Sequence, residues 1–153
     1  MHRPWSTLAA CGALLFAGAV EAREFTCTVT ARGVAHKLTV SFVDERVDSF
    51  RYLSITTNAE GYTCDVSASK RNAKSWTLGP DGRTLSVGLD LGTGTPVEAT
   101  VLDSASTTTF RFLKTRDFEV HRAACGLNGY VAPVISLVKG SGTCRLGSTE
   151  EQH

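Results

Sequence analysis

Apolar and polar residues alternate with a period of two along most of the chain beyond residue 22. In the clearest run, Leu85, Val87, Leu89 and Leu91 share one side, and small or polar residues share the other. Successive side chains of a β-strand point to opposite faces, so this period predicts a strand with one buried face. Similar runs cover residues 25–31, 38–42, 62–66, 97–101 and 107–113.

Turn-forming residues separate these runs. Residues 79–82 (GPDG) carry the strongest signal, because proline presets φ and glycine accepts an open conformation. Residues 44–48 (DERVD) are charged and predict a loop. About eight to ten short strands, with a turn roughly every 8–12 residues, predict an all-β fold: a single small antiparallel β-barrel or sandwich. A barrel or strongly curved sheet is slightly favoured.

Two runs break the alternation. Within residues 50–57 the pattern slips between Tyr52 and Leu53, which predicts a β-bulge there or a strand covered on both faces. Pro133 interrupts the apolar run 130–138. Because proline has no N–H to donate, this run is predicted to be an edge strand or to contain a bulge.

Residues 1–22 have a different pattern. The basic His2 and Arg3 precede an apolar run from Leu8 to Val20, and small residues stand at the −3 and −1 positions of a cleavage site after Ala22. This is the pattern of a secretory signal peptide, and the run is shorter than the roughly 20 residues of a membrane span. We therefore expect a cleaved signal peptide at 1–22, one β-rich domain at 23–147, a disordered tail at 148–153, and a periplasmic or secreted location.

Export changes how the cysteines are interpreted. The four that follow the leader, Cys27, Cys64, Cys125 and Cys144, are even in number and predict two disulfides. Three pairings are possible. The sequential one, Cys27–Cys64 with Cys125–Cys144, is favoured because Cys27 and Cys64 both lie on apolar faces of predicted strands. The chain has no C-x-x-C pair, so neither a metal site nor a cofactor is predicted.

Charge narrows the range of partners. The chain carries 16 Lys and Arg against 15 Asp and Glu, and removal of the leader takes one of each sign. Nucleic acid and anionic membranes favour a basic field, so neither is expected as the main partner. No apolar run after the leader is long enough for a membrane span. The predicted partner is another exported or envelope protein.

One basic segment is a candidate for binding that partner. Arg71, Lys74 and Trp76 lie in or next to a polar loop, and tryptophan and arginine are favoured at interface centres. Small exported β domains often present rigid loops to other proteins. In size, export and β character the chain is similar to bacterial periplasmic lysozyme inhibitors, which favours a protein-binding or inhibitory module. An envelope structural or assembly role is an alternative.

A second stretch suggests catalysis. Residues 101–104 (VLDS) resemble the catalytic loop of retroviral-type aspartic proteases, with Ala105 where that family has glycine. The resemblance implies an aspartic-type hydrolase in which Asp103 is the catalytic carboxylate. An aspartate followed by serine between two strands also makes local turn hydrogen bonds. His36 and His121 are predicted to lie at the surface.

Overall fold

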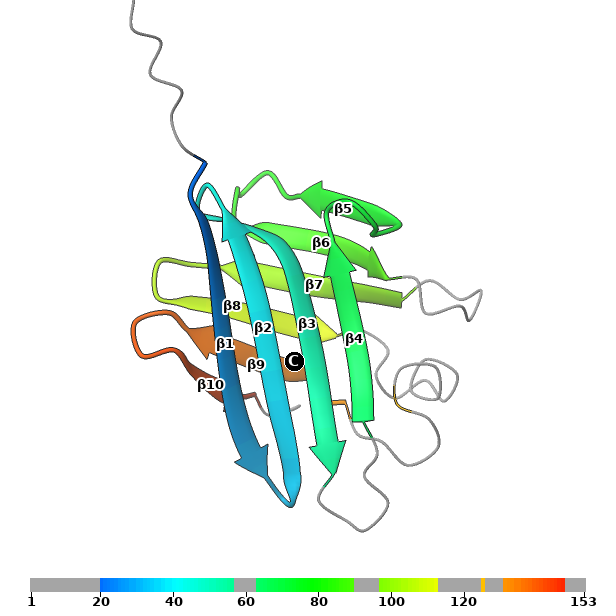
Figure 1. Cartoon of the computed structure of the whole chain (residues 1–153). Helices are drawn as coiled ribbons and strands as arrows, with labels where there is room; N and C mark the ends of the chain where they lie inside the picture. The colour runs from blue at the N-terminus through cyan, green and yellow to red at the C-terminus, as the bar shows by residue number, and fades with distance from the viewer. Residues whose placement is uncertain (1–19, 57–62, 90–96, 113–124, 126–130, 148–153) are drawn as a thin grey trace, which may run out of the picture.

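Two antiparallel β-sheets pack face to face in the computed structural model, which describes residues 20–56, 63–89, 97–112, 125 and 131–147 (Figure 1). The described strands are β1 (Ala22–Ala31), β2 (Val34–Val43), β3 (Arg46–Thr56), β4 (Thr63–Ser69), β5 (Ser75–Leu78), β6 (Thr84–Leu89), β7 (Val97–Asp103), β8 (Thr107–Phe112), β9 (Val134–Val138) and β10 (Thr143–Leu146). The prediction of an antiparallel all-β fold is confirmed.

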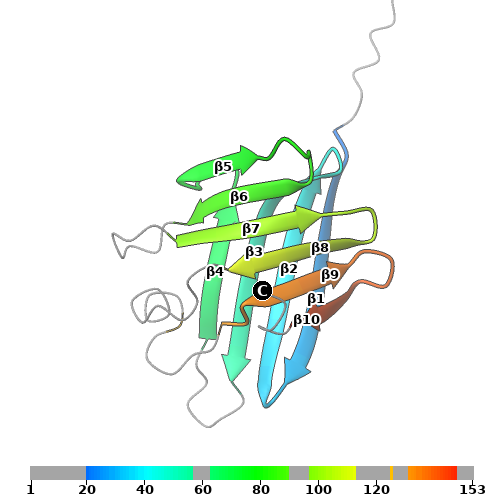
Figure 2. The same ribbon diagram turned by 180° about the vertical axis from the view of Figure 1, so that it is seen from behind.

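Except for β4 and β5, which lie in different sheets, consecutive strands pair with each other. The four-stranded sheet has the order β1-β2-β3-β4, and the six-stranded sheet has the order β10-β9-β8-β7-β6-β5. Figures 1 and 2 show the strands of one sheet running across those of the other. The sheets do not close on each other, so the fold is a sandwich rather than the slightly favoured barrel. Consecutive strands commonly lie side by side in antiparallel sheets, which explains this order.

The alternating runs fill the space between the sheets as predicted. Leu38, Val40 and Phe42 on β2 are buried, as are Leu85 and Val87 on β6. Aromatic side chains join the two layers at the centre. The Phe50 ring on β3 lies 4.9 Å from the Phe110 ring on β8, and the Tyr52 ring lies 5.2 Å from the Phe112 ring.

The loop predicted at 44–48 is confined to Asp44 and Glu45, and the bulge lies at Asp48 rather than near Tyr52. Asp44 and Glu45 form a tight turn with positive φ angles of 49° and 63°, and β3 begins at the next residue. Ser49 pairs with Ser41 while Val47 pairs with Phe42, so Asp48 is the extra residue of a bulge. Pairing with β2 extends β3 into a segment whose composition suggested a loop, because a partner strand outweighs weak local propensity.

Pro133 lies before a strand rather than inside one. β9 begins at Val134 and runs between β8 and β10, so the prediction of an edge strand or a bulge is wrong. The Pro133 carbonyl accepts a hydrogen bond from the N–H of Phe112 at 2.9 Å. Pro133 takes part in this contact through its carbonyl alone, so the N–H that proline lacks removes no hydrogen bond from the sheet.

Two disulfides are present, but the sequential pairing is wrong. Cys27 is bonded to Cys144, and Cys64 is bonded to Cys125. Cys27 and Cys64 lie on β1 and β4, the opposite edges of the four-stranded sheet. Three strand spacings separate these edges by about 14 Å, whereas Cα atoms more than about 7 Å apart cannot be bridged. Two disulfides fit an oxidising extracellular or periplasmic location.

The first strand begins at the predicted cleavage site. Ala22 pairs with Val43, and the Glu21 carbonyl accepts a hydrogen bond from the N–H of Asp44 at 3.3 Å. Cleavage after Ala22 would leave Arg23, the partner of Phe42, as the first residue, and this cleavage stays a prediction. Within the described ranges, no helix is long and apolar enough to cross a membrane.

Candidate binding groove

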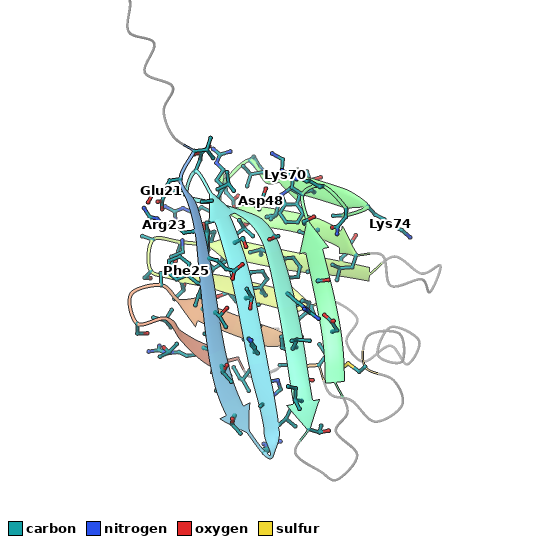
Figure 3. All side chains as sticks on the ribbon, in the orientation of Figure 1. Glu21, Arg23, Phe25, Asp48, Lys70 and Lys74 are labelled. Atoms are coloured by element: carbon teal, nitrogen blue, oxygen red, sulfur yellow. A yellow bond between two sulfur atoms is a disulfide. The ribbon has the colours of Figure 1, made fainter. Side chains whose placement is uncertain are left out.

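A groove of about 610 Å³ lies between the two sheets at the end where β5 forms the edge. Its volume falls within the roughly 300–1,000 Å³ of typical ligand sites. The residues that line it come from the β2–β3 hairpin, the β4–β5 connection, the β5–β6 hairpin and the end of β7. Its charged lining residues are Asp44, Arg46, Asp48, Lys70, Arg83 and Asp103, and its apolar ones include Val47, Trp76, Leu78, Leu85 and Val101. Figure 3 shows Asp48 and Lys70 at this end.

The groove exists because the inner face of the six-stranded sheet extends beyond its cover. On β6, Leu85 and Val87 are buried. Their partners on β5 are Leu78 and Trp76, which point to the same face of the sheet. Leu78 is nevertheless 43% exposed and Trp76 is half-buried. The four-stranded sheet therefore covers β6 fully and β5 only in part, which leaves an apolar wall open to solvent.

The bulge in β3 places an acidic residue at the rim of this groove. Asp48 lines the groove, and its carbonyl accepts a hydrogen bond from the N–H of Lys70 at 2.9 Å. A bulge reorients side chains at the end of a strand, which is how Asp48 leaves the alternation of β3. The hydrogen bond continues the β3–β4 ladder beyond Ser49 and Ser69, so Asp48 and Lys70 lie on the same side of the groove.

Local hydrogen bonds fix the connection between β4 and β5. The Ser69 carbonyl accepts bonds from the N–H groups of Asn72 and Ala73 at 3.1 and 2.9 Å. The Asn72 side chain accepts a bond from the N–H of Ser69 at 2.7 Å. Residues 70–72 are therefore presented from a closed turn, which limits the entropy lost when a ligand binds them.

The β5–β6 turn is also tightly held. The Asp81 carboxylate accepts hydrogen bonds from the hydroxyl of Thr84 and from the N–H groups of Thr84 and Arg83. These bonds lower the pKa of Asp81 to about 2, and the bond from the Thr84 hydroxyl has the largest effect. The predicted turn at 79–82 is confirmed by a bond of 3.0 Å from the N–H of Gly82 to the carbonyl of Gly79.

Several charges of the groove are available to a ligand. Arg46, Lys70 and Arg83 make no ion pair with another described residue, and neither do Asp44 and Asp48. Such side chains keep their full capacity to donate or accept hydrogen bonds. The groove therefore offers cationic and anionic groups beside an apolar wall.

Asp103 lines the groove but already has partners. The Lys139 Nζ lies 2.8 Å from its Oδ1, and the Thr108 hydroxyl donates to the same oxygen at 2.6 Å. Lys139 also donates to the Ser104 carbonyl at 2.7 Å and lies 5.1 Å from the centre of the Phe42 ring. The carboxylate thus pairs with an ammonium group, whereas an aspartic protease dyad pairs two carboxylates that share a proton.

The structure separates the residues predicted to bind. Trp76 lines the groove, whereas Arg71 and Lys74 are exposed beside it and do not line it. Figure 3 shows Lys74 pointing outward. Sequence reasoning missed Arg46 and Arg83, since ordinary charged residues in separate segments of the chain carry no local signal of a common site. The binding role of all these residues stays a prediction.

His36 is buried, which contradicts its predicted surface position. It is 1% exposed, and its Nδ1 lies 2.8 Å from the Tyr52 hydroxyl. The same hydroxyl accepts a bond from the N–H of Ala132 at 2.9 Å. His36 has the same parity as Leu38 and Val40, so the alternation itself indicated an inward position. His121 lies outside the described residues.

Comparison with known proteins provides no relative: no family model, no curated protein and no solved structure matches the chain. The described ranges contain no group of three or more His, Cys, Asp and Glu side chains that could hold a metal ion. The functional argument therefore depends on the groove and on the loops that form its rim.

Proposed function

We propose that this chain is an exported binding module that holds another exported or envelope protein in the groove beside β5. The observation that carries the proposal is the combination of an uncovered apolar wall with charged side chains that make no ion pair with another described residue. Interface centres are typically apolar with aromatic anchors, and polar groups surround them. Trp76 and Leu78 would form the centre, and Arg46, Lys70 and Arg83 would form the rim.

The construction of the rim supports the same proposal. Hydrogen bonds within the β4–β5 connection and the β5–β6 turn hold the two basic segments in place. The Cys64–Cys125 bond ties down β4, the strand that leads into the first of these segments. A surface that is ordered before binding loses less conformational entropy on association, so a small groove can support useful affinity.

A crosslinking experiment tests this proposal. A photoreactive amino acid at Arg71, which is exposed beside the groove, should capture one partner from envelope or secreted extract of the native host. Lys70→Glu and Trp76→Phe should each weaken the binding of that purified partner, the first by about tenfold or more.

Lys37→Glu is the matched control, because Lys37 is an exposed lysine on β2 and does not line the groove. Circular dichroism should show that all three variants stay folded. If Lys37→Glu weakens the complex as much as Lys70→Glu does, binding does not use the groove and the proposal fails.

A hydrolase that uses Asp103 is a second candidate, because Asp103 lines the same groove. Its ion pair with Lys139 favours a structural role instead. Any hydrolytic activity of the pure protein that survives Asp103→Asn rules out this candidate. An envelope structural or assembly role is included in the binding proposal, since assembly also requires a partner surface.

A further inference from the structure

We infer that the occupant of the groove is an extended acidic segment of the partner, which adds to the six-stranded sheet as a further strand beside β5. This inference rests on the proposed function and specifies the form of the partner's binding segment. Strand addition uses main-chain hydrogen bonds for affinity and alternate side chains for specificity. Four features around β5 support it: an unpaired strand edge, backbone groups that point away from β6, an apolar wall and an excess of positive charge.

β5 is the terminal strand of the six-stranded sheet, with β6 on one side and no strand of the described chain on the other. Figures 1 and 2 both show β5 at the end of the six-stranded sheet, beyond β6. Edge strands present unpaired N–H and C=O groups that can template another strand, and natural proteins usually block them.

The other three edge strands are crosslinked by the disulfides. β1, β10 and β4 carry Cys27, Cys144 and Cys64, so each of these edge strands is bonded covalently to another part of the fold. β5 is the one edge strand of the described sheets that carries no cysteine.

The backbone of β5 points the required groups outward. The N–H of Gly79 donates to the Thr84 carbonyl at 2.7 Å, so Gly79 and Thr84 form a hydrogen-bonded pair between β5 and β6. Bonded and non-bonded pairs alternate in an antiparallel ladder, which directs the N–H and C=O groups of Trp76 and Leu78 away from β6. In the described part of the chain, no backbone bond outside the β5–β6 pair involves Trp76 or Leu78.

An added strand would also close the groove. Its inward side chains would lie beside Trp76 and Leu78, the uncovered wall, at the short distances of cross-strand neighbours. Apolar side chains at alternate positions would bury this wall against Asp48 and Lys70 of the opposite side. The intervening side chains would face the solvent on the outer face of the sheet.

Charge favours an acidic segment. Lys139 neutralises Asp103. Among the other charged residues in and beside the groove, basic side chains outnumber acidic ones. The acids are Asp44, Asp48 and Asp81. The cations are Arg46, Lys70, Arg71 and Arg83. Complementary charge steers the encounter and disfavours a basic segment.

The probe is an acetylated and amidated octapeptide that alternates glutamate with valine, compared with a counterpart that alternates lysine with valine. Titration followed by amide NMR should show saturable binding of the acidic peptide. Hydrogen exchange at the amides of Trp76 and Leu78 should slow in the complex, because these groups become donors to the added strand. The lysine peptide should bind at least about tenfold more weakly.

Leu78→Pro removes one outward donor and leaves the β5–β6 bonds in place, since proline is tolerated on the free side of an edge strand. It should weaken acidic peptide binding by about five- to tenfold beyond the loss seen in Leu78→Ala, which keeps the N–H. Equal affinities of the two variants, or no protection of the Trp76 and Leu78 amides, would overturn strand addition.

The two proposals can fail separately. If the native partner depends on Lys70 but Leu78→Pro binds it as tightly as Leu78→Ala does, the groove binds a partner by another geometry and only this inference fails. If substitutions at Lys70 and at Leu78 both leave the affinity for the partner unchanged, the proposed function fails as well. A concentration-dependent dimer in sedimentation, abolished by Leu78→Pro, would assign the edge to a second copy and overturn the acidic partner.

Discussion

His36 lies in a buried site, where its Nδ1 is 2.8 Å from the Tyr52 hydroxyl and that hydroxyl accepts a bond from the N–H of Ala132. Burial lowers the pKa of His36 below its usual range. The strand neighbours of His36 on β1 and β3, Val29 and Ser54, carry no charge that could oppose this shift.

Stability should consequently decrease in mild acid through His36. The unfolded chain, with an ordinary histidine pKa of about 6.5, takes up the proton before the folded chain does. This contribution is complete above about pH 6.5 and is lost as the pH falls through the folded-state pKa. Urea denaturation should give a larger loss between about pH 7 and pH 5 for the wild type than for His36→Gln. The same loss in both proteins would contradict this origin.

At the scale of the elements, one ion pair joins two hairpins. Asp103 and Ser104 belong to the end of β7 and its turn, and Lys139 follows β9. The Asp103 and Lys139 side chains are 25% and 21% exposed, so their contact lies largely out of water. The N–H of Lys139 also donates to the Ser106 carbonyl at 2.9 Å. The β7–β8 turn is thereby attached to the β9–β10 turn through both side chain and backbone.

Breaking this link should cost stability in a coupled way. Asp103→Asn should lower the free energy of unfolding by about 1–3 kcal/mol, because Lys139 loses its counter-ion in a partly buried site. Lys139→Met should cost a similar amount. The double variant should cost clearly less than the sum of the two, since each single change removes the same contact. Additive losses in urea denaturation would show that the two side chains do not interact.

At the scale of the whole molecule, the disulfides hold the two meanders together. Cys27–Cys144 joins the first described strand to the last across 117 residues, and Cys64–Cys125 spans 61 residues. Chain-entropy arguments give about 5 and about 4 kcal/mol of stabilisation for closing loops of these lengths. Both bonds connect the four-stranded sheet to the other half of the fold, which short hairpin turns cannot do.

The pairing is directly measurable. Trypsin digestion without reductant should yield peptide 24–32 linked to 140–145, and peptide 52–70 linked to 123–139, by mass spectrometry. Reduction should separate each pair. A species that joins 24–32 to 52–70 would show the sequential pairing instead, and would contradict the position of β1 and β4 at opposite edges of one sheet.

The local parts of the structure were predictable, and their errors have local causes. Leu85 and Val87 alternate with polar or small residues along one strand, so their burial followed from the pattern. His36 has the same parity as Leu38, so the pattern indicated an inward position, whereas its polar side chain suggested the surface. Asp44 and Glu45 were correctly associated with a change of direction, but pairing with β2 draws the residues after them into β3.

The amino-acid sequence alone determined which segments are strands, which side of each faces inward, and that four cysteines would form disulfides. These properties depend on near neighbours along the chain. The tertiary structure alone decided which cysteines meet, and that Trp76, Asp48 and Arg83 line one groove. These properties depend on which strands become sheet edges and on how far one sheet extends beyond the other. No stretch of neighbouring residues records that, because it arises from packing two sheets whose strands cross.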